Sequence, residues 1–316
     1  MARDKLIFGP VKSRRLGRSL GLELVPKKVC SMDCVYCEVG RTTLLTLERK
    51  PYYPWEKIEE AIITASKIQD KFDVFTFTGS GEPTLNSFFE DAVFLAKKLI
   101  KKPIALLTNS SLLWMKSVRS AVCEFDIVLP SLDAGTEEAF LKVNQPCKGL
   151  KLEAIVEGLK ALSKEKKGKV WVEVLLVKGL NDDLENLSAI KKVLNEVSPD
   201  KVQLNTVVRP GALSNILPLS YEELKKIAEF FGDKAEVVVD STSIDRFKRL
   251  VEKGISRKKL EEELIAYVKR RPATFEELLS ALDAEEKVLS LVIDSLLKEN
   301  KLQKKLHEDK IYYIVY

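Results

Sequence analysis

Three of the five cysteines in the chain lie within eight residues, at Cys30, Cys34 and Cys37 of the segment VCSMDCVYCEVG. A C-x3-C-x2-C spacing of thiols in a reduced compartment indicates a metal centre. A structural zinc site usually has four protein ligands, and no fourth cysteine or histidine lies nearby. Three thiolates suit a 4Fe-4S cluster that leaves one iron open to a small molecule. A zinc site completed by water or a carboxylate, or three unrelated buried thiols, are the alternatives.

The rest of the composition excludes several other classes of protein. A single histidine, His307, excludes a metal site built from two histidines. With 45% apolar and 31% charged residues, the 316-residue chain matches neither a disordered nor a membrane-spanning protein. Charged residues stand among the first five, where a signal peptide would begin its apolar stretch. We therefore expect a cytoplasmic protein with reduced thiols and no membrane partner.

Strand patterns and helix patterns alternate along the first 240 residues, and this alternation predicts the elements that position the cysteines. Such βα units form a parallel sheet, so the fold class is α/β. Six units predict a partial TIM-type (β/α)6 barrel, in which the chemistry lies on loops after the carboxyl ends of the strands. The six predicted strands span residues 20–25, 72–77, 103–107, 125–129, 169–177 and 201–207.

The loop after the second predicted strand, TGSGEPTLN, contains two glycines and an acid. Gly79 and Gly81, on either side of Ser80, allow the backbone to approach a ligand closely because no side chain blocks it. The carboxylate of Glu82 can pair with an ammonium group. A plain strand-to-helix turn is the alternative interpretation of this loop.

The spacing of Cys30, Cys34 and Cys37, with Tyr36 just before the last of them, resembles that of the radical S-adenosylmethionine (SAM) enzymes. The resemblance implies that the three cysteines ligate a 4Fe-4S cluster whose open iron is chelated by the amino and carboxylate groups of SAM. It also implies an external electron donor of the flavodoxin or ferredoxin type. The reduced cluster would cleave SAM to methionine and a 5′-deoxyadenosyl radical, which abstracts hydrogen from a substrate.

Further cofactor contacts follow from the same resemblance. Gly81 and Glu82 match the Gly-Gly-Glu motif that holds the methionine amino group in this family, and the family often binds the cofactor ribose with a polar residue after the fourth strand. Asp133 could instead cap the helix that starts near Gly135. The residues implied as cofactor-binding are Tyr36, Gly79, Ser80, Gly81, Glu82, Asn109, Ser131, Asp133 and Asn205.

Residues 131–146 resemble the corresponding segment of the wyosine-type branch of the family, which modifies tRNA. Residues 8–21 resemble a set of radical SAM proteins grouped with that branch, most of which have no assigned substrate. The first of these resemblances implies tRNA as a candidate substrate. The wyosine enzymes carry a second cluster on cysteines ahead of the radical motif, whereas this chain has no cysteine before Cys30. Cys147, in the loop after this segment, is the one side chain besides the cluster ligands that we consider for a catalytic role. Cys123 is predicted to be a buried apolar thiol.

Basic residues are concentrated near the amino terminus. Residues 1–50 contain 11 lysines and arginines against five acids, although the whole chain has a net charge of only +5. Guanidinium groups bind phosphates and carboxylates well, so an anionic substrate is favoured, RNA being one. The candidate substrate ligands are Arg14, Arg15, Arg18 and Arg209; salt bridges within the protein are the alternative.

The last quarter of the chain has a different pattern. Residues 241–254 predict a connecting helix after the barrel of residues 1–240, and residues 255–316 predict three helices and two short strands, a small winged-helix-like domain. Thr274 with Glu277 and Asp283 with Glu286 have the spacing of capping boxes. This domain has 12 basic and 12 acidic residues, which argues against DNA binding. An Fe-S redox sensor that binds DNA through this domain is the alternative function.

Overall fold

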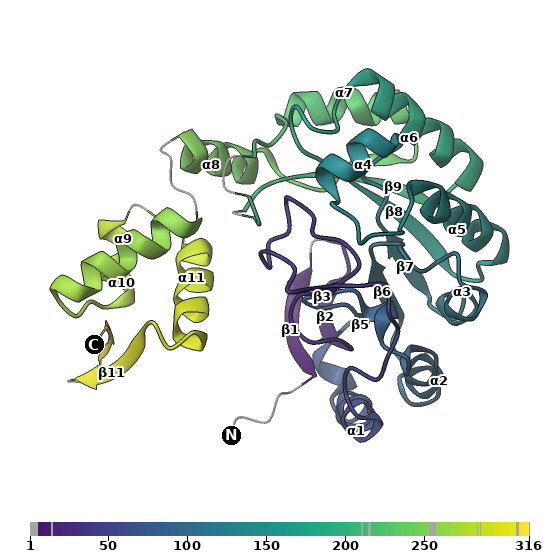
Figure 1. Cartoon of the computed structure of the whole chain (residues 1–316). Helices are drawn as coiled ribbons and strands as arrows, with labels where there is room; N and C mark the ends of the chain where they lie inside the picture. Colours follow the sequence, from purple (N-terminus) through teal and green to yellow (C-terminus); the bar gives the residue numbers. More distant parts are fainter. Residues whose placement is uncertain are drawn as a thin grey trace.

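The largest element of the computed structural model is a curved sheet (Figure 1). The structure describes residues 6–13, 15–209, 211–213, 216–252, 257–282, 284, 286–307 and 310–315. Within them, the strands from β2 onward in this sheet are parallel to one another, and β1 pairs antiparallel with β2 at one edge. In sheet order the strands are β1 (Ile7–Ser13), β2 (Gly17–Leu22), β5 (Val74–Phe77), β6 (Ile104–Thr108), β7 (Ile127–Pro130), β8 (Lys169–Leu176), β9 (Lys201–Thr206) and β10 (Ala235–Val237).

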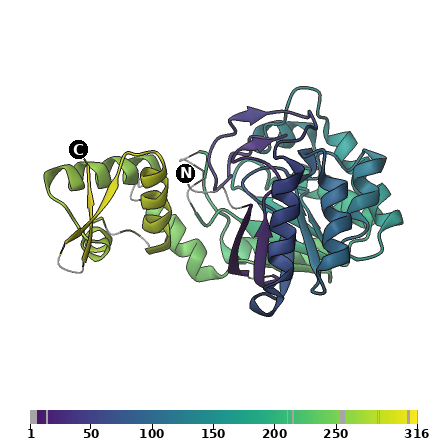
Figure 2. The ribbon, with the colours of Figure 1, turned by 90° about the horizontal axis from the view of Figure 1, so that it is seen from below.

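Helices cover one face of this sheet, and apolar strand residues hold them there (Figures 1 and 2). On β8 the alternate residues Val170, Val172 and Val174 are fully buried, and aromatic rings such as Phe77 and Phe125, whose centroids lie 5.0 Å apart, fill the core. The helices are α1 (Trp55–Ser66), α2 (Phe89–Leu99), α3 (Lys116–Val122), α4 (Glu137–Val143), α5 (Leu152–Glu165), α6 (Leu184–Val197) and α7 (Tyr221–Phe231).

The predicted α/β partial barrel is confirmed, and among the described residues its sheet contains two strands, β1 and β10, besides the six predicted. β10 has only three residues, too few for a hydrophobic pattern to identify. β1 is an exposed edge strand whose pairing with β2 shifts between Phe8 and Val11, so its residues do not alternate regularly. On the other face, near the amino ends of the strands, Leu16, Val74 and Ala105 form a smaller apolar cluster.

The C-terminal part lies to one side of the barrel beyond α8 (Ser241–Glu252) in both views (Figures 1 and 2). It contains α9 (Arg257–Arg270), α10 (Phe275–Ala281), α11 (Glu286–Lys298) and a hairpin of β11 (Gln303–His307) and β12 (Lys310–Ile314). These elements have their own core, and the capping box of Thr274 and Glu277 is present. Asp283 lies outside the described residues. The winged-helix-like assignment and the domain boundaries stay predictions.

Candidate radical SAM site

The three clustered cysteines lie on a loop at the carboxyl end of β2, which we call the cysteine loop (residues 29–45). Short parallel strands β3 (Val29–Cys30) and β4 (Leu44–Leu45) join its two ends. Between them, the amide of Cys37 donates to the carbonyl of Cys34 at 3.1 Å and closes a turn. The loop also pairs with the chain after α4, because the Cys147 amide donates to the Ser31 carbonyl at 2.9 Å. The loop is therefore fixed on both sides.

Each of the three sulfur atoms accepts a hydrogen bond from one side chain. Asn109 Nδ2 lies 3.4 Å from Cys30 Sγ, and Asn144 Nδ2 lies 3.5 Å from Cys34 Sγ. The third donor is the ammonium group of Lys28, which lies 3.1 Å from Cys37 Sγ. All three thiols are free and half-buried. Such donors stabilise thiolates and the negative charge of a thiolate-bound cluster.

Burial makes thiolates unfavourable here in the absence of a metal. Desolvation, with a further contribution from the charge of Glu82, raises the pKa of Cys30 to about 11. Desolvation and the charge of Asp133 raise the pKa of Cys34 even further. The charges of the neighbouring cysteines add to the rise at Cys30 and Cys34. A bound cation would reverse this preference by stabilising all three thiolates together.

These observations test whether the residues fit a cluster. Three free thiols lie within eight residues of one loop, and each has an N–H donor, an arrangement that suits a thiolate-bound iron-sulfur cluster. Among the described residues, no group of three or more His, Cys, Asp or Glu side chains is placed to hold a single metal ion. The donor set fits the 4Fe-4S cluster that the spacing predicts.

The glycine loop after β5 packs its backbone directly against the cysteine loop. A Cβ atom on Gly81 would lie 2.1 Å from the Val29 carbonyl oxygen, so no other residue fits without a shift of the backbone. The Glu82 amide donates to this same carbonyl at 3.1 Å, and the Ser80 carbonyl accepts from the Lys28 amide at 2.8 Å. The close approach of the two backbones therefore requires a glycine at position 81, which a plain turn alone would not.

The Glu82 carboxylate is buried and connects the glycine loop to the end of β6. Its Oε1 accepts from the Thr84 amide at 3.2 Å, from Thr84 Oγ1 at 2.7 Å and from Thr108 Oγ1 at 2.8 Å. Its Oε2 accepts only from the Asn109 amide, at 2.8 Å, and so keeps an accepting position. Burial raises the pKa of this carboxyl group despite these bonds. A cation at Oε2 would favour the ionised form.

Asp133 is a second buried carboxylate, at the end of β7. It accepts from the Tyr36 hydroxyl, from Asn144 Nδ2 at 2.8 Å and from the Leu175 amide at 2.9 Å. Burial raises its pKa to about 6. The capping alternative is wrong, because the N-cap of α4 is Thr136. Asp133 instead orients Asn144, the donor to Cys34.

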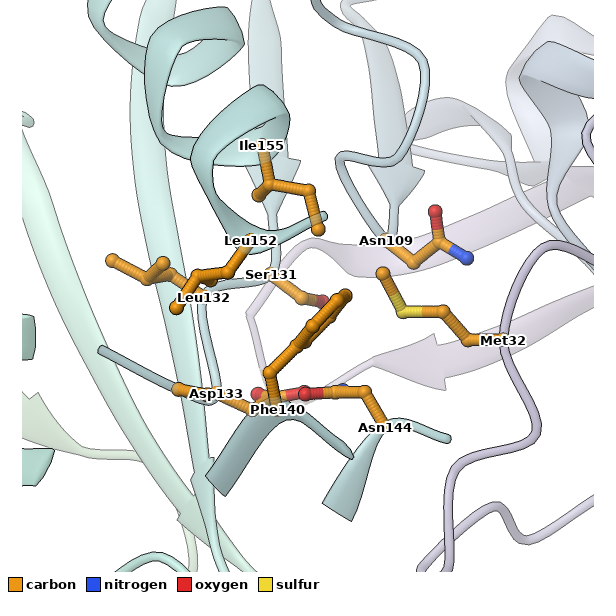
Figure 3. Close-up of a pocket in the computed structure, with 10 residues that line it drawn as sticks. Met32, Asn109, Ser131, Leu132, Asp133, Phe140, Asn144, Leu152 and Ile155 are labelled. Carbon is orange, nitrogen blue, oxygen red and sulfur yellow. The ribbon is translucent and has the colours of Figure 1, made fainter. Parts of the chain in front are cut away.

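A narrow pocket opens between these polar groups and the helices after β7 (Figure 3). Met32 and Asn109 lie on the side of the cysteine loop, whereas Asp133 and Asn144 lie below Phe140 (Figure 3). Three residues predicted to bind the cofactor thus line one pocket, together with Met32 and Asn144, which sequence reasoning missed. The complete lining consists of Met32, Asn109, Ser131, Leu132, Asp133, Ala134, Phe140, Asn144, Leu152 and Ile155.

Other predicted residues lie elsewhere or are already paired. Asn205 Nδ2 donates to Glu173 on β8 at 2.9 Å, and the same carboxylate pairs with Arg15 at 2.8 Å. Arg18 pairs with Asp73 at 2.8 Å, at the amino end of β2 and so at the far end of this strand from the cysteine loop.

Two predicted residues lie beside the cysteine loop itself. Arg209 pairs with Glu38 of this loop at 2.7 Å. Cys147 is half-buried next to the loop, with its sulfur 3.7 Å from the Leu45 carbonyl oxygen. Arg14 lies outside the described residues.

Comparison with known proteins agrees with this geometry. The family model described as Radical SAM superfamily matches residues 24–189. A UPF0026 protein of Methanocaldococcus jannaschii is 32% identical over 314 residues, which cover 98% of this chain and 95% of that protein. A Brachyspira hyodysenteriae protein named GTPase Obg is 32% identical over 99% of this chain, and the chain spans 45% of the length of that relative. A radical SAM methyltransferase from Sphaerobacter thermophilus has the same fold, with a TM-score of 0.53 and 15% identity over 69% of this chain and 65% of its own.

The chain belongs to the radical SAM superfamily and is similar to UPF0026 proteins. This confirms the predicted class of enzyme and its two cofactors, a 4Fe-4S cluster and SAM. The matched residues run from just before the cysteine loop into α6, so they include the loops that follow β2, β5, β6, β7 and β8 but not the end of β9. Among the described residues, no helix is both long and apolar enough to cross a membrane.

Proposed function

We propose that Cys30, Cys34 and Cys37 ligate the 4Fe-4S cluster and that this chain carries out the radical chemistry of its superfamily. The cluster, when bound, supplies the electron that cleaves SAM to methionine and a 5′-deoxyadenosyl radical. The observation that supports this most strongly is the set of three side-chain donors, one on each sulfur, at 3.1, 3.4 and 3.5 Å. An external one-electron donor of the flavodoxin or ferredoxin type would reduce the cluster.

The loops around the cysteines are the proposed binding site for SAM. Glu82 has an accepting position on Oε2 for the ammonium group, next to Asn109, and Gly81 lets the backbones approach. Asp133 and Ser131 border the pocket and can accept from hydroxyl groups of a ribose. The remaining proposed contacts are Tyr36, Gly79 and Ser80 in the same loops and Asn205 on β9.

We propose an anionic substrate, with tRNA as the candidate. The excess of 11 basic over five acidic residues in residues 1–50 supports this. At the cysteine loop, Arg41 pairs with Asp33 at 2.8 Å and Arg209 pairs with Glu38 at 2.7 Å, yet 52% and 40% of these arginine side chains stay exposed. A guanidinium group has five N–H donors, and one carboxylate uses only some of them. Phosphate oxygens could bind the rest.

The test has two stages. The cluster is reconstituted anaerobically, dithionite and SAM are added, and 5′-deoxyadenosine is quantified by mass spectrometry. Its absence in a sample with a complete cluster would contradict the proposed chemistry. For the substrate, tRNA nucleosides from a deletion strain are compared with those of the parent strain. A nucleoside mass restored by the wild-type gene supports tRNA, whereas identical nucleoside profiles remove tRNA as the candidate and leave the radical chemistry standing.

A further inference from the structure

Lys28 is held in an unusual backbone conformation immediately before the cysteine loop. Its φ angle is +64°, a left-handed value that L-residues other than glycine adopt only at a cost in free energy. The surrounding chain fixes this conformation: the Lys28 amide donates to the Ser80 carbonyl at 2.8 Å. The Lys28 carbonyl accepts from the amides of Thr43 and Leu44 at 3.0 and 3.1 Å. The glycine loop and the far end of the cysteine loop thus both position this residue.

The side chain of Lys28 is buried, and a carboxylate does not balance its charge. Lys28 is 4% exposed, the only lysine among the buried residues of the described chain. None of the ion pairs in the described part of the chain includes it, and its ammonium group contacts Cys37 Sγ at 3.1 Å. A buried charge without a counter-charge is strongly unfavourable. Negative charge on a cluster bound through Cys37 would balance the charge of this ammonium group.

The donors on the other two cysteines differ from Lys28 in charge. Cys30 and Cys34 accept from the neutral amides of Asn109 and Asn144, at longer distances of 3.4 and 3.5 Å. Of the three clustered cysteines, only Cys37 contacts a positively charged side chain among the described residues. Three thiolates give an oxidised 4Fe-4S cluster a net negative charge, and the addition of one electron makes this charge larger. A buried cation at this distance stabilises the reduced form more than the oxidised form.

We propose that Lys28 raises the reduction potential of the cluster through its contact with Cys37. This inference rests on the proposed ligation by the three cysteines. In the step concerned, one electron passes from the external donor to the cluster, and the charge of the cluster becomes more negative by one unit. No covalent bond forms or breaks and no proton is transferred. Lys28 is thus a positioning residue. It acts on the cluster through Cys37, and no contact with the substrate is proposed for it.

The test compares Lys28→Gln with a matched control, Lys27→Gln. Lys27 is the preceding residue in the chain and is exposed, so its charge is screened by water. Each reconstituted protein is titrated against redox mediators without SAM, and the reduced cluster is quantified by electron paramagnetic resonance. For Lys28→Gln we expect the ratio of reduced to oxidised cluster at a given potential to fall about tenfold, a downward shift of about 59 mV for a one-electron couple. Lys27→Gln should match the wild type, and Lys28→Arg, which keeps the charge, should restore most of the potential.

Two results would overturn the proposal. One is a complete cluster in Lys28→Gln whose potential equals that of Lys27→Gln. The other is a loss of iron from Lys28→Gln while Lys28→Arg stays fully loaded, which would make the ammonium group a requirement for assembly and not for tuning. Failure of the proposed function looks different, because the wild-type chain itself would then bind no cluster or form no 5′-deoxyadenosine.

Discussion

The carboxyl groups at the two ends of the parallel sheet differ in burial and in the direction in which their pKa values are shifted. At the carboxyl end, Glu82 and Asp133 are buried, and desolvation raises the pKa of both, that of Asp133 to about 6. At the amino end, Asp73 lies on the surface, where hydrogen bonds from Arg18 lower its pKa to about 2. Burial of a carboxylate opposes folding unless other groups stabilise the charge. The comparison shows that, among the described residues, the two buried carboxylates at the carboxyl end have no cationic side chain to lower their pKa, whereas Asp73 at the amino end is paired with Arg18.

The largest effect is expected for a substitution in the cysteine loop, at the carboxyl end of the sheet. Cys34→Ala should abolish the 4Fe-4S absorption after anaerobic reconstitution, because two thiolates do not hold the cluster in place. The matched control is Cys123→Ala, at a buried cysteine that follows α3 and lies outside the cysteine loop. Iron, sulfide and the visible spectrum are measured for both. A Cys34→Ala protein with the wild-type spectrum would remove the cysteine loop as the cluster site.

Asp133→Asn tests the buried carboxylate by its pH dependence. In the folded chain the pKa of Asp133 is about 6, above the ordinary 3.8, so the unfolded state loses its proton first. The contribution of Asp133 to the free energy of unfolding is fully present below about pH 4. It decreases as the pH rises to about 6 and stays constant at higher pH. The wild type should lose up to about 3 kcal/mol relative to Asp133→Asn across this window.

The measurement for Asp133→Asn is urea unfolding of the cluster-free chain at pH 4 to 7. All three tryptophans, at positions 55, 114 and 171, lie in the barrel, so fluorescence reports on the barrel alone. The quantity of interest is the difference in unfolding free energy between wild type and variant at each pH. A difference that stays flat between pH 4 and 6 would show that burial does not shift the pKa of Asp133 as described.

Glu82→Gln should weaken SAM binding while the cluster is retained. Replacing the carboxylate by an amide removes the charge that would pair with the ammonium group of SAM. Since hydrogen bonds to charged groups contribute about 1.5–3 kcal/mol, we expect the Kd to rise about tenfold or more. Glu60→Gln, at an exposed carboxylate on α1, is the control. Equal Kd values for wild type and Glu82→Gln would assign Glu82 to the support of the loops alone.

Sequence reasoning found those parts of the site that a short segment encodes, and missed the contacts between distant segments. The cysteine spacing and the order of strands predicted the class of fold and where its loops meet. Asn144 lies 110 residues from its partner Cys34, and no local pattern marks it as a donor. Lys27 and Lys28 are chemically identical neighbours in the sequence, yet only the fold buries one of them against a cysteine. Burial depends on long-range packing, which a single sequence does not display.

The predicted arginines show the same limit for charge. Arg15, Arg18 and Arg209 were expected to bind an anion, and each pairs with a carboxylate of the protein. A sequence reports that charges are present, whereas the fold decides which of them neutralise one another. Arg209 stays the best placed of the three for a substrate because its partner, Glu38, belongs to the cysteine loop.

The smallest effect is expected at the amino end, for Asp73→Asn. Asp73 contributes stability above about pH 4, and this contribution is lost as the pH falls through about 2, the reverse of Asp133. Both partners of the pair are about half exposed, so water and salt screen their attraction. At pH 7 the urea midpoint should decrease slightly in low salt and match the wild type in 1 M salt, with cluster content unchanged. A decrease as large as the shift for Asp133→Asn, or any loss of iron, would mean that the amino end also supports the site and that the two ends are not independent.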